Sequence, residues 1–364
     1  MRKRVLAAAA ALMLAVCMTG CGNGENASLT VLEKTQPASE TESETEVPEP
    51  GSVPASASGE DGSEAPAVTT APTTTAAPPV TTTKAPDPVA IDMEPVYASA
   101  AWFSAVHTTI SNQELKETIK KLDEIISRYG SSLSFAYQNM NTGVTVTYNT
   151  NKQYQTCSTV KAPYAKSLME YGVDLDEQIK ITEIYKGAAP EEGHINYGDV
   201  GKMFTVRQLI KNAVELSDNT AHMTLIKRFG YSIYNNYESR IGAHSYLYSG
   251  YYFGMCTAYD MLVNYTDIYK YSISDDRGKE LKQMLIDSTF DYQISDALAG
   301  KYPVAHKYGS DMLTNSYHDC AICYADSPFV LCIFSEQKPE TEAANTMFRD
   351  LALIFDKLNT LIVS

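Results

Sequence analysis

Positive charge, clustered histidines and long apolar runs are scarce in this sequence, and each scarcity excludes a class of protein. There are 29 lysines and arginines against 44 aspartates and glutamates, so the net charge is −15. This balance excludes nucleic acid and anionic lipid surfaces as expected partners. The six histidines show no close pair and no H-x-E-x-x-H spacing, so we expect no metal site and no cofactor.

Cysteine is also too sparse to form a disulfide framework. Of the seven cysteines, Cys17 and Cys21 fall in the first 21 residues, which leaves an odd number of five. Cys320 and Cys323 have the C-x-x-C spacing of a redox motif, but their surroundings predict a strand. Residues three apart on a strand point to opposite faces, so we interpret both as buried small apolar side chains.

The one marked apolar run is at the N-terminus. Residues 2–4 are basic, residues 5–16 are apolar but too short to span a bilayer comfortably, and small residues precede Cys21. This arrangement resembles a bacterial lipoprotein signal, in which the cysteine is lipidated and becomes the first mature residue. We predict a signal peptide over residues 1–20, export, and a lipid anchor at Cys21. The protein would then sit on the outer face of the cytoplasmic membrane, in the cell-wall zone; an ordinary signal peptide cut nearby is the alternative.

Residues 21–96 are predicted to be a disordered tether. The stretch 22–96 has no aromatic residue, is rich in Thr, Pro, Glu, Ser and Ala, and carries 13 acidic against 2 basic residues. Such a segment cannot bury enough apolar surface to offset its ordering entropy. About 75 flexible residues reach roughly 45–50 Å, enough to hold a domain away from a membrane. A plain solubilising spacer is the alternative interpretation.

The remainder, residues 97–364, is long enough for one domain with a sizeable core. Capping boxes begin at Ser111 and Thr205, and the turn residues 141–143 separate two β-rich runs. We predict helices after Ser111 to about 130 and over 158–171, 206–216, 220–229, 232–241, from 257 and over 342–358, and strands over 133–138, 144–148, 305–309, 319–324 and 329–334. This order predicts an α/β fold: an antiparallel β-sheet flanked by helices, with an all-α subdomain.

Ser158 and Lys161 form the most informative pair in the chain. If a helix begins at the serine, the two side chains face the same way about 5–6 Å apart at Cβ. The lysine amine can then take the serine's proton, and the serine becomes a nucleophile. The tetrad Ser158–Lys161 alone is a weak signal, but Ser217-Asp218-Asn219 and Lys307-Tyr308-Gly309 follow it.

These three motifs, in this order, resemble the S-x-x-K, S-D-N and K-T-G motifs of class A-like β-lactamases and penicillin-binding proteins. The resemblance covers nearly all of residues 97–364. It implies that Ser158 is the nucleophile that forms an acyl-enzyme, that Lys161 is the general base, and that Ser217 relays a proton to the leaving nitrogen. Asp218 is interpreted as a structural anchor for its turn.

The resemblance also implies the substrate-binding residues. Asn219 would hydrogen-bond the acyl side-chain amide of the substrate. Lys307 would crowd Lys161 with charge and attract a substrate carboxylate, with Tyr308 and Gly309 beside it on the same strand. The backbone N–H groups of Ser158 and Ser310 would form the oxyanion hole.

Two departures separate this chain from a simple β-lactamase. Class A enzymes deacylate with a glutamate on an Ω-loop, yet the corresponding residues 243–256 contain no carboxylate. The nearest, Glu238, is predicted to be solvated on a helix. Tyr308 replaces the small hydroxyl residue of the third motif, and no arginine occurs between Lys307 and Ser335. The acyl-enzyme is therefore expected to be long-lived.

Several functions remain open from the sequence. We expect a monomeric serine hydrolase that acts on β-lactams by a β-lactamase-type reaction, slowed by the lack of an Ω-loop glutamate. The alternative is a D,D-peptidase whose partner is the D-Ala-D-Ala terminus of a peptidoglycan stem peptide. A β-lactam or muropeptide sensor and a wall-binding protein with a dead site are further alternatives. Tyrosines gather in the segment that replaces the Ω-loop, where they pack the loop or form an aromatic wall for a glycan or peptide: Tyr246, Tyr248, Tyr251 and Tyr252.

Overall fold

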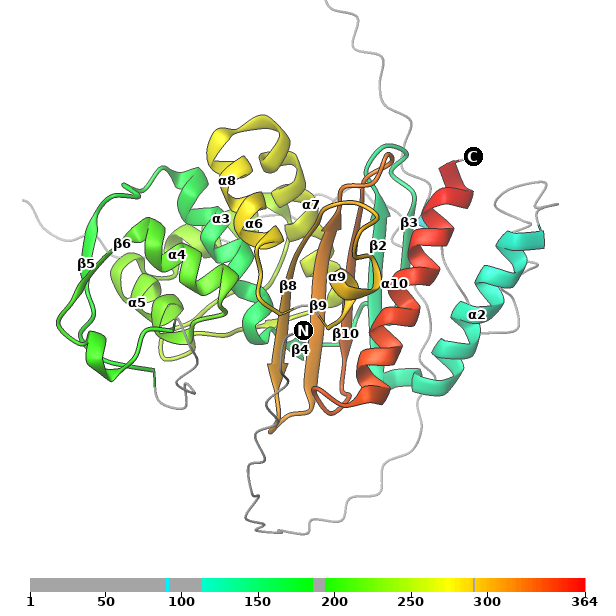
Figure 1. The fold of residues 1–364 in the computed structure, drawn as a ribbon, viewed down its shortest axis with the longest axis horizontal. Coiled ribbons are helices and arrows are strands. Elements are labelled where there is room, and N and C mark those ends of the chain that lie inside the picture. The colour runs from blue at the N-terminus through cyan, green and yellow to red at the C-terminus, as the bar shows by residue number, and fades with distance from the viewer. Residues whose placement is uncertain (1–89, 92–112, 186–193, 291, 364) are drawn as a thin grey trace, which may run out of the picture. The chain divides into compact units, whose positions relative to one another are not determined.

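A computed structural model describes residues 90–91, 113–185, 194–290 and 292–363 (Figure 1). The predicted signal peptide, Cys21, the capping residue Ser111 and all of the predicted tether except residues 90–91 lie outside this part of the chain. In these described ranges, no helix is both long and apolar enough to cross a bilayer.

The centre of the fold is a six-stranded sheet with the strand order β1-β3-β2-β10-β9-β8. Five strands pair antiparallel, namely β2 (Leu133–Asn139), β3 (Thr145–Tyr148), β8 (Val304–Asp311), β9 (Ser316–Cys323) and β10 (Phe329–Ser335). The short strand β1 (Ala90–Ile91) pairs parallel to β3 at one edge. The segment predicted as tether thus includes two residues of the sheet.

Each face of the sheet carries its own apolar core. Helices α2 (Gln113–Tyr129) and α10 (Glu342–Val363) cover one face, and α7 (Ala258–Ser274) covers the other (Figure 1). Side chains alternate between the two faces, as strand geometry requires. Cys320 packs into the α7 side and Cys323 into the α10 side, so the interpretation of this pair as buried small side chains is confirmed.

The other long helices, which lie on the α7 side of the sheet, form the predicted all-α part. Most begin and end where the sequence indicates: α4 (Val206–Glu215) and α7 each start with a capping box, at Thr205 and Thr257. The others are α3 (Lys161–Tyr171), α5 (Asn219–Phe229), α6 (Ser232–Ile241) and α8 (Asp276–Ile286). The predicted fold class is therefore confirmed.

Several short elements were not predicted. They are the helix α8, the one-turn helix α9 (Ile294–Ala297) and the strand pairs β4 (Tyr154–Gln155) with β7 (Met255–Cys256) and β5 (Gln178–Lys180) with β6 (Met203–Thr205). Strands of two or three residues are too short to show periodicity. The β4–β7 pair matters for the site, because it joins the segment that leads into Ser158 to the end of residues 243–256.

The helix predicted to begin at Ser158 begins later. Residues Cys157–Val160 form a 3₁₀ turn, and α3 follows from Lys161. Cys157 has a φ of 48°, an uncommon conformation for a side chain of its size, and so the chain turns sharply just before the serine. The two motif residues still lie on one side of the turn, because the 3₁₀ spacing also aligns residues three apart.

Candidate active site

The predicted nucleophile and base lie side by side. Lys161 Nζ is 3.0 Å from Ser158 Oγ, while Ser158 itself is half-buried. The lysine also reaches the second motif, 2.6 Å from the carbonyl oxygen and 3.3 Å from Oγ of Ser217. One amine therefore touches both serines, so it can exchange a proton with either of them.

Burial makes Lys161 suited to act as a base. Its side chain is only 1% exposed, and this desolvation lowers its pKa from 10.5 to about 7, while Asp218 and Cys157 oppose the shift. A substantial share of the amine is therefore neutral near neutral pH. Desolvation is the main cause of this shift, and the charge interaction expected between Lys161 and Lys307 is a cause that lowers the pKa of Lys307.

The turn that carries Ser217 is held in an uncommon conformation. Its φ is 58°, in the left-handed region that few non-glycine residues adopt. Asp218 caps the next helix: Oδ1 accepts from the N–H groups of Thr220 and Ala221, at 2.7 and 3.0 Å, and Oδ2 accepts from Ile195 at 2.6 Å. The interpretation of Asp218 as an anchor for this turn fits these bonds, since the cap fixes Ser217 against α3.

Asn219 contributes to the same cluster. Its Oδ1 accepts a hydrogen bond from Lys161 Nζ at 2.6 Å. The side chain therefore orients the base, in addition to the substrate contact that the resemblance implies. The first two motifs meet through Lys161, although 56 residues separate it from Ser217 in the chain.

Gly309 lets the third motif approach the nucleophile. A Cβ atom at this position would lie 2.9 Å from Ser158 N, 3.0 Å from Thr159 N and 3.0 Å from Cys157 Cβ. Strand β8 thus runs directly against the turn that carries Ser158, with Ser310 next along the strand. Any side chain at position 309 would push the strand away from the serine, and this closeness explains the glycine.

Lys307 is not open to a cleft, which corrects the expectation that it attracts a substrate carboxylate directly. Its side chain is fully buried, and desolvation holds the pKa well below 10.5, with the charge on Lys161 as a second cause. The Tyr308 ring lies 4.3 Å from Lys307 Nζ and packs on Phe290, with ring centroids 4.2 Å apart. The amine of Lys307 therefore lies beside an aromatic pair and is shielded from solvent.

His306, the neighbour of Lys307, faces the other way. Its Nδ1 lies 3.0 Å from Asp319 Oδ1, and the other oxygen of that carboxylate accepts from the N–H of Ile294 in α9. His306 therefore belongs to a buried polar pair with Asp319. In the described part of the chain, no group of three His, Cys, Asp or Glu side chains could hold a metal ion.

The segment 243–256 presents an aromatic ring to the base. The Phe253 ring centroid is 5.7 Å from Lys161 Nζ. Behind it, His222 packs on Phe253 at 5.5 Å, and its Nε2 lies 2.9 Å from the carbonyl oxygen of Tyr252, to which it must donate. Burial lowers the His222 pKa to about 3, with the charge on Lys161 as a second cause, so the ring is neutral.

Glu238 is buried, and the prediction that it is solvated was wrong. The residue is inaccessible, and its Oε2 accepts from both the N–H and the hydroxyl of Ser245, at 2.8 and 2.5 Å. Burial raises its pKa. The chain reverses at Gly242, which has a φ of 76°, and so brings Ser245 back onto the helix. Glu238 therefore fastens the start of the segment.

The family of the chain follows from its sequence taken as a whole. A model of the beta-lactamase enzyme family matches residues 114–358, more than half of the 364 residues. The chain belongs to this family. The matched range contains all three motifs and, except for β1, the first residue of α2 and the end of α10, every helix and strand described above. These residues form a class A-like serine β-lactamase domain.

Solved structures with the same fold include both β-lactamases and a penicillin-binding protein. A class A β-lactamase from Mycobacterium abscessus is 19% identical, with a TM-score of 0.56 over 68% of this chain and 99% of that one. The β-lactamase from Chitinophaga pinensis DSM 2588 is also 19% identical, with a TM-score of 0.57 over 66% and 98%. PBP-A is 16% identical, with a TM-score of 0.56 over 67% and 95%.

Three residues near the predicted site were missed by the sequence analysis, because they belong to none of the three motifs: His222, Phe253 and Phe290. For Phe253, the only signal in the sequence was that residues 243–256 contain no carboxylate. For Phe290 no sequence signal was available, since it lies in the connection after α8 and meets Tyr308 only in the folded chain.

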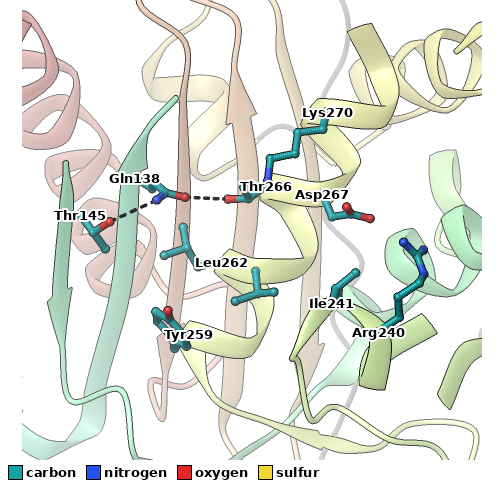
Figure 2. A pocket seen from close by; sticks show the side chains of 10 residues that line it. Gln138, Thr145, Arg240, Ile241, Tyr259, Leu262, Thr266, Asp267 and Lys270 are labelled. Atoms are coloured by element: carbon teal, nitrogen blue, oxygen red, sulfur yellow. Dashed lines mark hydrogen bonds between the residues drawn. The ribbon is translucent and has the colours of Figure 1, made fainter. Parts of the chain in front are cut away.

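A separate surface pocket of about 390 Å³ lies where α6 and α7 meet strands β2 and β3 (Figure 2). Figure 2 shows the chain of hydrogen bonds that lines it: Gln138 bonds to Thr145 on one side and to Thr266 on the other. Two of its three charged residues are engaged in ion pairs, Asp267 with Lys166 and Arg240 with Glu170, and the third is Lys270. None of the predicted site residues lines this pocket.

Proposed function

We propose that this protein is a serine hydrolase that forms an acyl-enzyme with β-lactams through Ser158 and releases the product slowly. One observation carries the proposal: Lys161 Nζ lies 3.0 Å from Ser158 Oγ, and burial lowers the pKa of this lysine to about 7. An amine that is neutral near physiological pH and in contact with a serine hydroxyl is an activating base.

Acylation would proceed in two proton transfers. Ser158 Oγ attacks the lactam carbonyl carbon while Lys161 takes the hydroxyl proton. The C–N bond then breaks, and Ser217, in contact with Lys161, passes a proton to the leaving nitrogen. The product is an ester on Ser158, with the lactam nitrogen released as an amine within the same molecule.

The oxyanion formed during this attack would be held by the N–H groups of Ser158 and Ser310. The close approach at Gly309 supports this assignment, because it brings the β8 backbone against the Ser158 N–H. Backbone donors fixed in this way stabilise a developing oxyanion without reorganisation. Asn219 orients Lys161 and would contact the acyl side chain of the substrate.

Deacylation would be the slow step. Hydrolysis of the ester needs a base that activates water, and residues 243–256 offer an aromatic ring at Phe253 where that segment meets Lys161. The carboxylate of Glu238 already accepts hydrogen bonds from the N–H and the hydroxyl of Ser245. The neutral imidazole of His222 lies behind Phe253 and bonds to Tyr252. Of the groups considered in the described part of the chain, Lys161 is the one in contact with Ser158 that could serve as base for a slow hydrolysis.

A D,D-peptidase acting on D-Ala-D-Ala termini of peptidoglycan is the second candidate, and the apolar face at Phe253 favours it. A penicillin-binding peptidase uses the same acylation residues and keeps a β-lactam as a lasting adduct. PBP-A, which has this fold, has also been solved as an acyl-enzyme complex with penicillin G in a mutant form (16% identical, TM-score 0.56).

The test is a time course of intact mass for the full chain incubated with benzylpenicillin. We expect one adduct that persists for hours, with little free penicilloate. An adduct that clears within seconds while penicilloate accumulates would contradict slow release and identify an efficient β-lactamase. No adduct at any time would overturn the proposed function, and persistent labelling of Ser158→Ala would overturn the site.

We also propose that Cys21 carries a lipid that anchors the protein outside the cytoplasmic membrane. The support is the basic, apolar and small-residue pattern of residues 2–21. In a bacterial host, we expect radiolabelled palmitate to be incorporated into the wild-type chain and not into Cys21→Ser. Equal labelling of both would contradict the anchor, and an unlabelled but exported wild-type chain would identify an ordinary signal peptide.

A further inference from the structure

A second cavity of about 700 Å³ lies on the outer side of segment 243–256. We call it the tyrosine groove and define it by its aromatic lining, Tyr246, Tyr248, Tyr251 and Phe253. Its remaining walls come from the β4–β7 pair and the turn between β8 and β9. The motif serines and lysines do not line it, and Phe253, which also contacts Lys161, separates the groove from the catalytic cluster.

Aromatic rings in the groove face the solvent. Tyr248 is 62% and Tyr251 is 69% exposed, and Met255 beside them is 50% exposed. A tight turn produces this exposure: Tyr251 N donates to Tyr248 O at 3.0 Å, and Gly250 between them has a φ of 85°. Large exposed aromatic side chains grouped in a cavity are typical of a ligand-binding surface.

The polar side chains of the groove are almost all uncharged. Amides and hydroxyls come from Gln153, Gln155, Thr314 and Ser316, and no lysine or arginine is among the residues that line it. The single carboxylate, Glu336, is paired with Lys152 at 2.7 Å. The lining also includes His244, whose Nδ1 lies 3.4 Å from Asp260 Oδ1. It therefore offers an anionic ligand no lysine or arginine, and a cationic ligand only a compensated carboxylate.

The groove is held in shape by hydrogen bonds along the whole segment. Asn235 binds the backbone of Leu247 from both sides, through Nδ2 and Oδ1, each at 2.9 Å. Glu238 holds Ser245, and the carbonyl oxygen of Gly254 accepts from Thr156 N at 2.9 Å. A Cβ on Gly254 would lie 2.5 Å from the Tyr246 carbonyl oxygen, so the segment folds tightly on itself.

A ligand that enters such a preformed groove loses little free energy to ordering the protein. Its volume is within the roughly 300–1,000 Å³ of small-molecule sites. Tyrosine faces present flat apolar surface with a polar tip. Pyranose rings match this surface, because each has an apolar C–H face for stacking and a rim of hydroxyls for amide and hydroxyl partners.

We propose that the tyrosine groove binds an uncharged glycan chain of N-acetylhexosamine units. The acetamido group matches the glutamine amides, and the lack of net charge matches a lining without lysine or arginine. A stem peptide that ends in a carboxylate finds no lysine or arginine there. The choice of a wall-type glycan rests on the proposed function; a glycan strand in the groove would lie close to the serine that attacks its attached peptide.

The test uses the full chain and a β-1,4-linked N-acetylglucosamine hexamer, with binding measured by titration calorimetry. The variant Tyr248→Ala with Tyr251→Ala removes the two most exposed rings of the groove. We expect it to weaken binding about tenfold or more. Tyr171→Ala is the matched control, because Tyr171 is 72% exposed and lies on α3 outside the groove, and it should bind like the wild type.

Melting temperatures establish that the double variant is folded, as expected for exposed side chains. No binding by the wild type, or equal binding by the wild type and the double variant, would overturn the proposal. It would also be overturned if the double variant lost affinity only for a D-Ala-D-Ala pentapeptide, which would make the groove a peptide site. Wild-type acylation by benzylpenicillin is followed in parallel, so hexamer binding without acylation would contradict only the proposed catalytic function.

Discussion

The pH dependence of acylation follows directly from the burial of Lys161. Its pKa is lowered to about 7 by desolvation, so about half of the amine is neutral at pH 7. With the ordinary pKa of 10.5, only about 3 in 10⁴ molecules would be neutral at that pH, which makes the gain in reactive base about 10³-fold. This gain corresponds to roughly 4 kcal/mol, at 1.36 kcal/mol for each tenfold change.

The direction of the pH dependence follows from which protonation state of Lys161 reacts. The neutral amine accepts the proton of Ser158, so the acylation rate constant should rise about tenfold per pH unit below pH 7 and level off above about pH 8. The assay is quenched-flow acylation by benzylpenicillin between pH 5.5 and 9, read by intact mass. The midpoint of the profile reports the pKa of the free protein when the second-order rate constant is plotted.

Lys161→Arg is the informative variant because it keeps the positive charge but cannot deprotonate in this range. We expect acylation to fall about 10²- to 10⁴-fold and the pH profile to flatten. A wild-type rate constant that does not change between pH 5.5 and 9, or an arginine variant that acylates at the wild-type rate, would refute the role of Lys161 as base.

Three further substitutions probe the surroundings of the catalytic cluster. Phe253→Glu places a carboxylate where the ring faces Lys161, and it should shorten the lifetime of the acyl-enzyme about 10²-fold or more, measured by loss of the adduct mass. Gly309→Ala should destabilise the fold by about 1–3 kcal/mol in urea unfolding and slow acylation, because its Cβ meets Ser158 N. Phe290→Ala uncovers Tyr308 and Lys307, and it should raise the second-order acylation rate constant several-fold in quenched-flow measurements.

Each of these substitutions has a control or an opposing outcome. Phe253→Gln has a similar shape without a base, and an equally short-lived adduct in that variant would contradict a carboxylate effect. Wild-type acylation and stability in Gly309→Ala would show that β8 need not approach Ser158 so closely. A slower Phe290→Ala, with Phe290→Leu unchanged, would mean that the ring supports the substrate and does not restrict it.

Most of the fold could be predicted because its signals are local. The capping box at Thr205, the helix start at Thr257, the glycine after α6 and the short apolar runs of β9 and β10 each act within a few residues, and the elements they indicate are present. The pair Ser158 and Lys161 was likewise visible because three residues separate them. Even so, the helix begins at Lys161 and not at the serine, because Cys157 turns the chain first.

The rest of the site depends on contacts between distant parts of the chain. Glu238 looks like a solvated helix residue until the reversal at Gly242 brings Ser245 onto it. Lys307 looks accessible in the sequence, yet it is fully buried in the folded chain, where Phe290 from another connection packs on its neighbour Tyr308. Burial of this kind has no sequence pattern, since it depends on which side chain a remote loop supplies.

The central claim, that Ser158 is the acylated nucleophile, is tested most directly by locating the adduct. The full chain is incubated with benzylpenicillin at pH 8, digested and analysed by peptide mass spectrometry with fragmentation. We predict that the penicilloyl group is found on Ser158, in the peptide that also contains Lys161. An adduct on another residue, or its absence from this peptide in an acylated sample, would contradict the proposed site and the mechanism built on it.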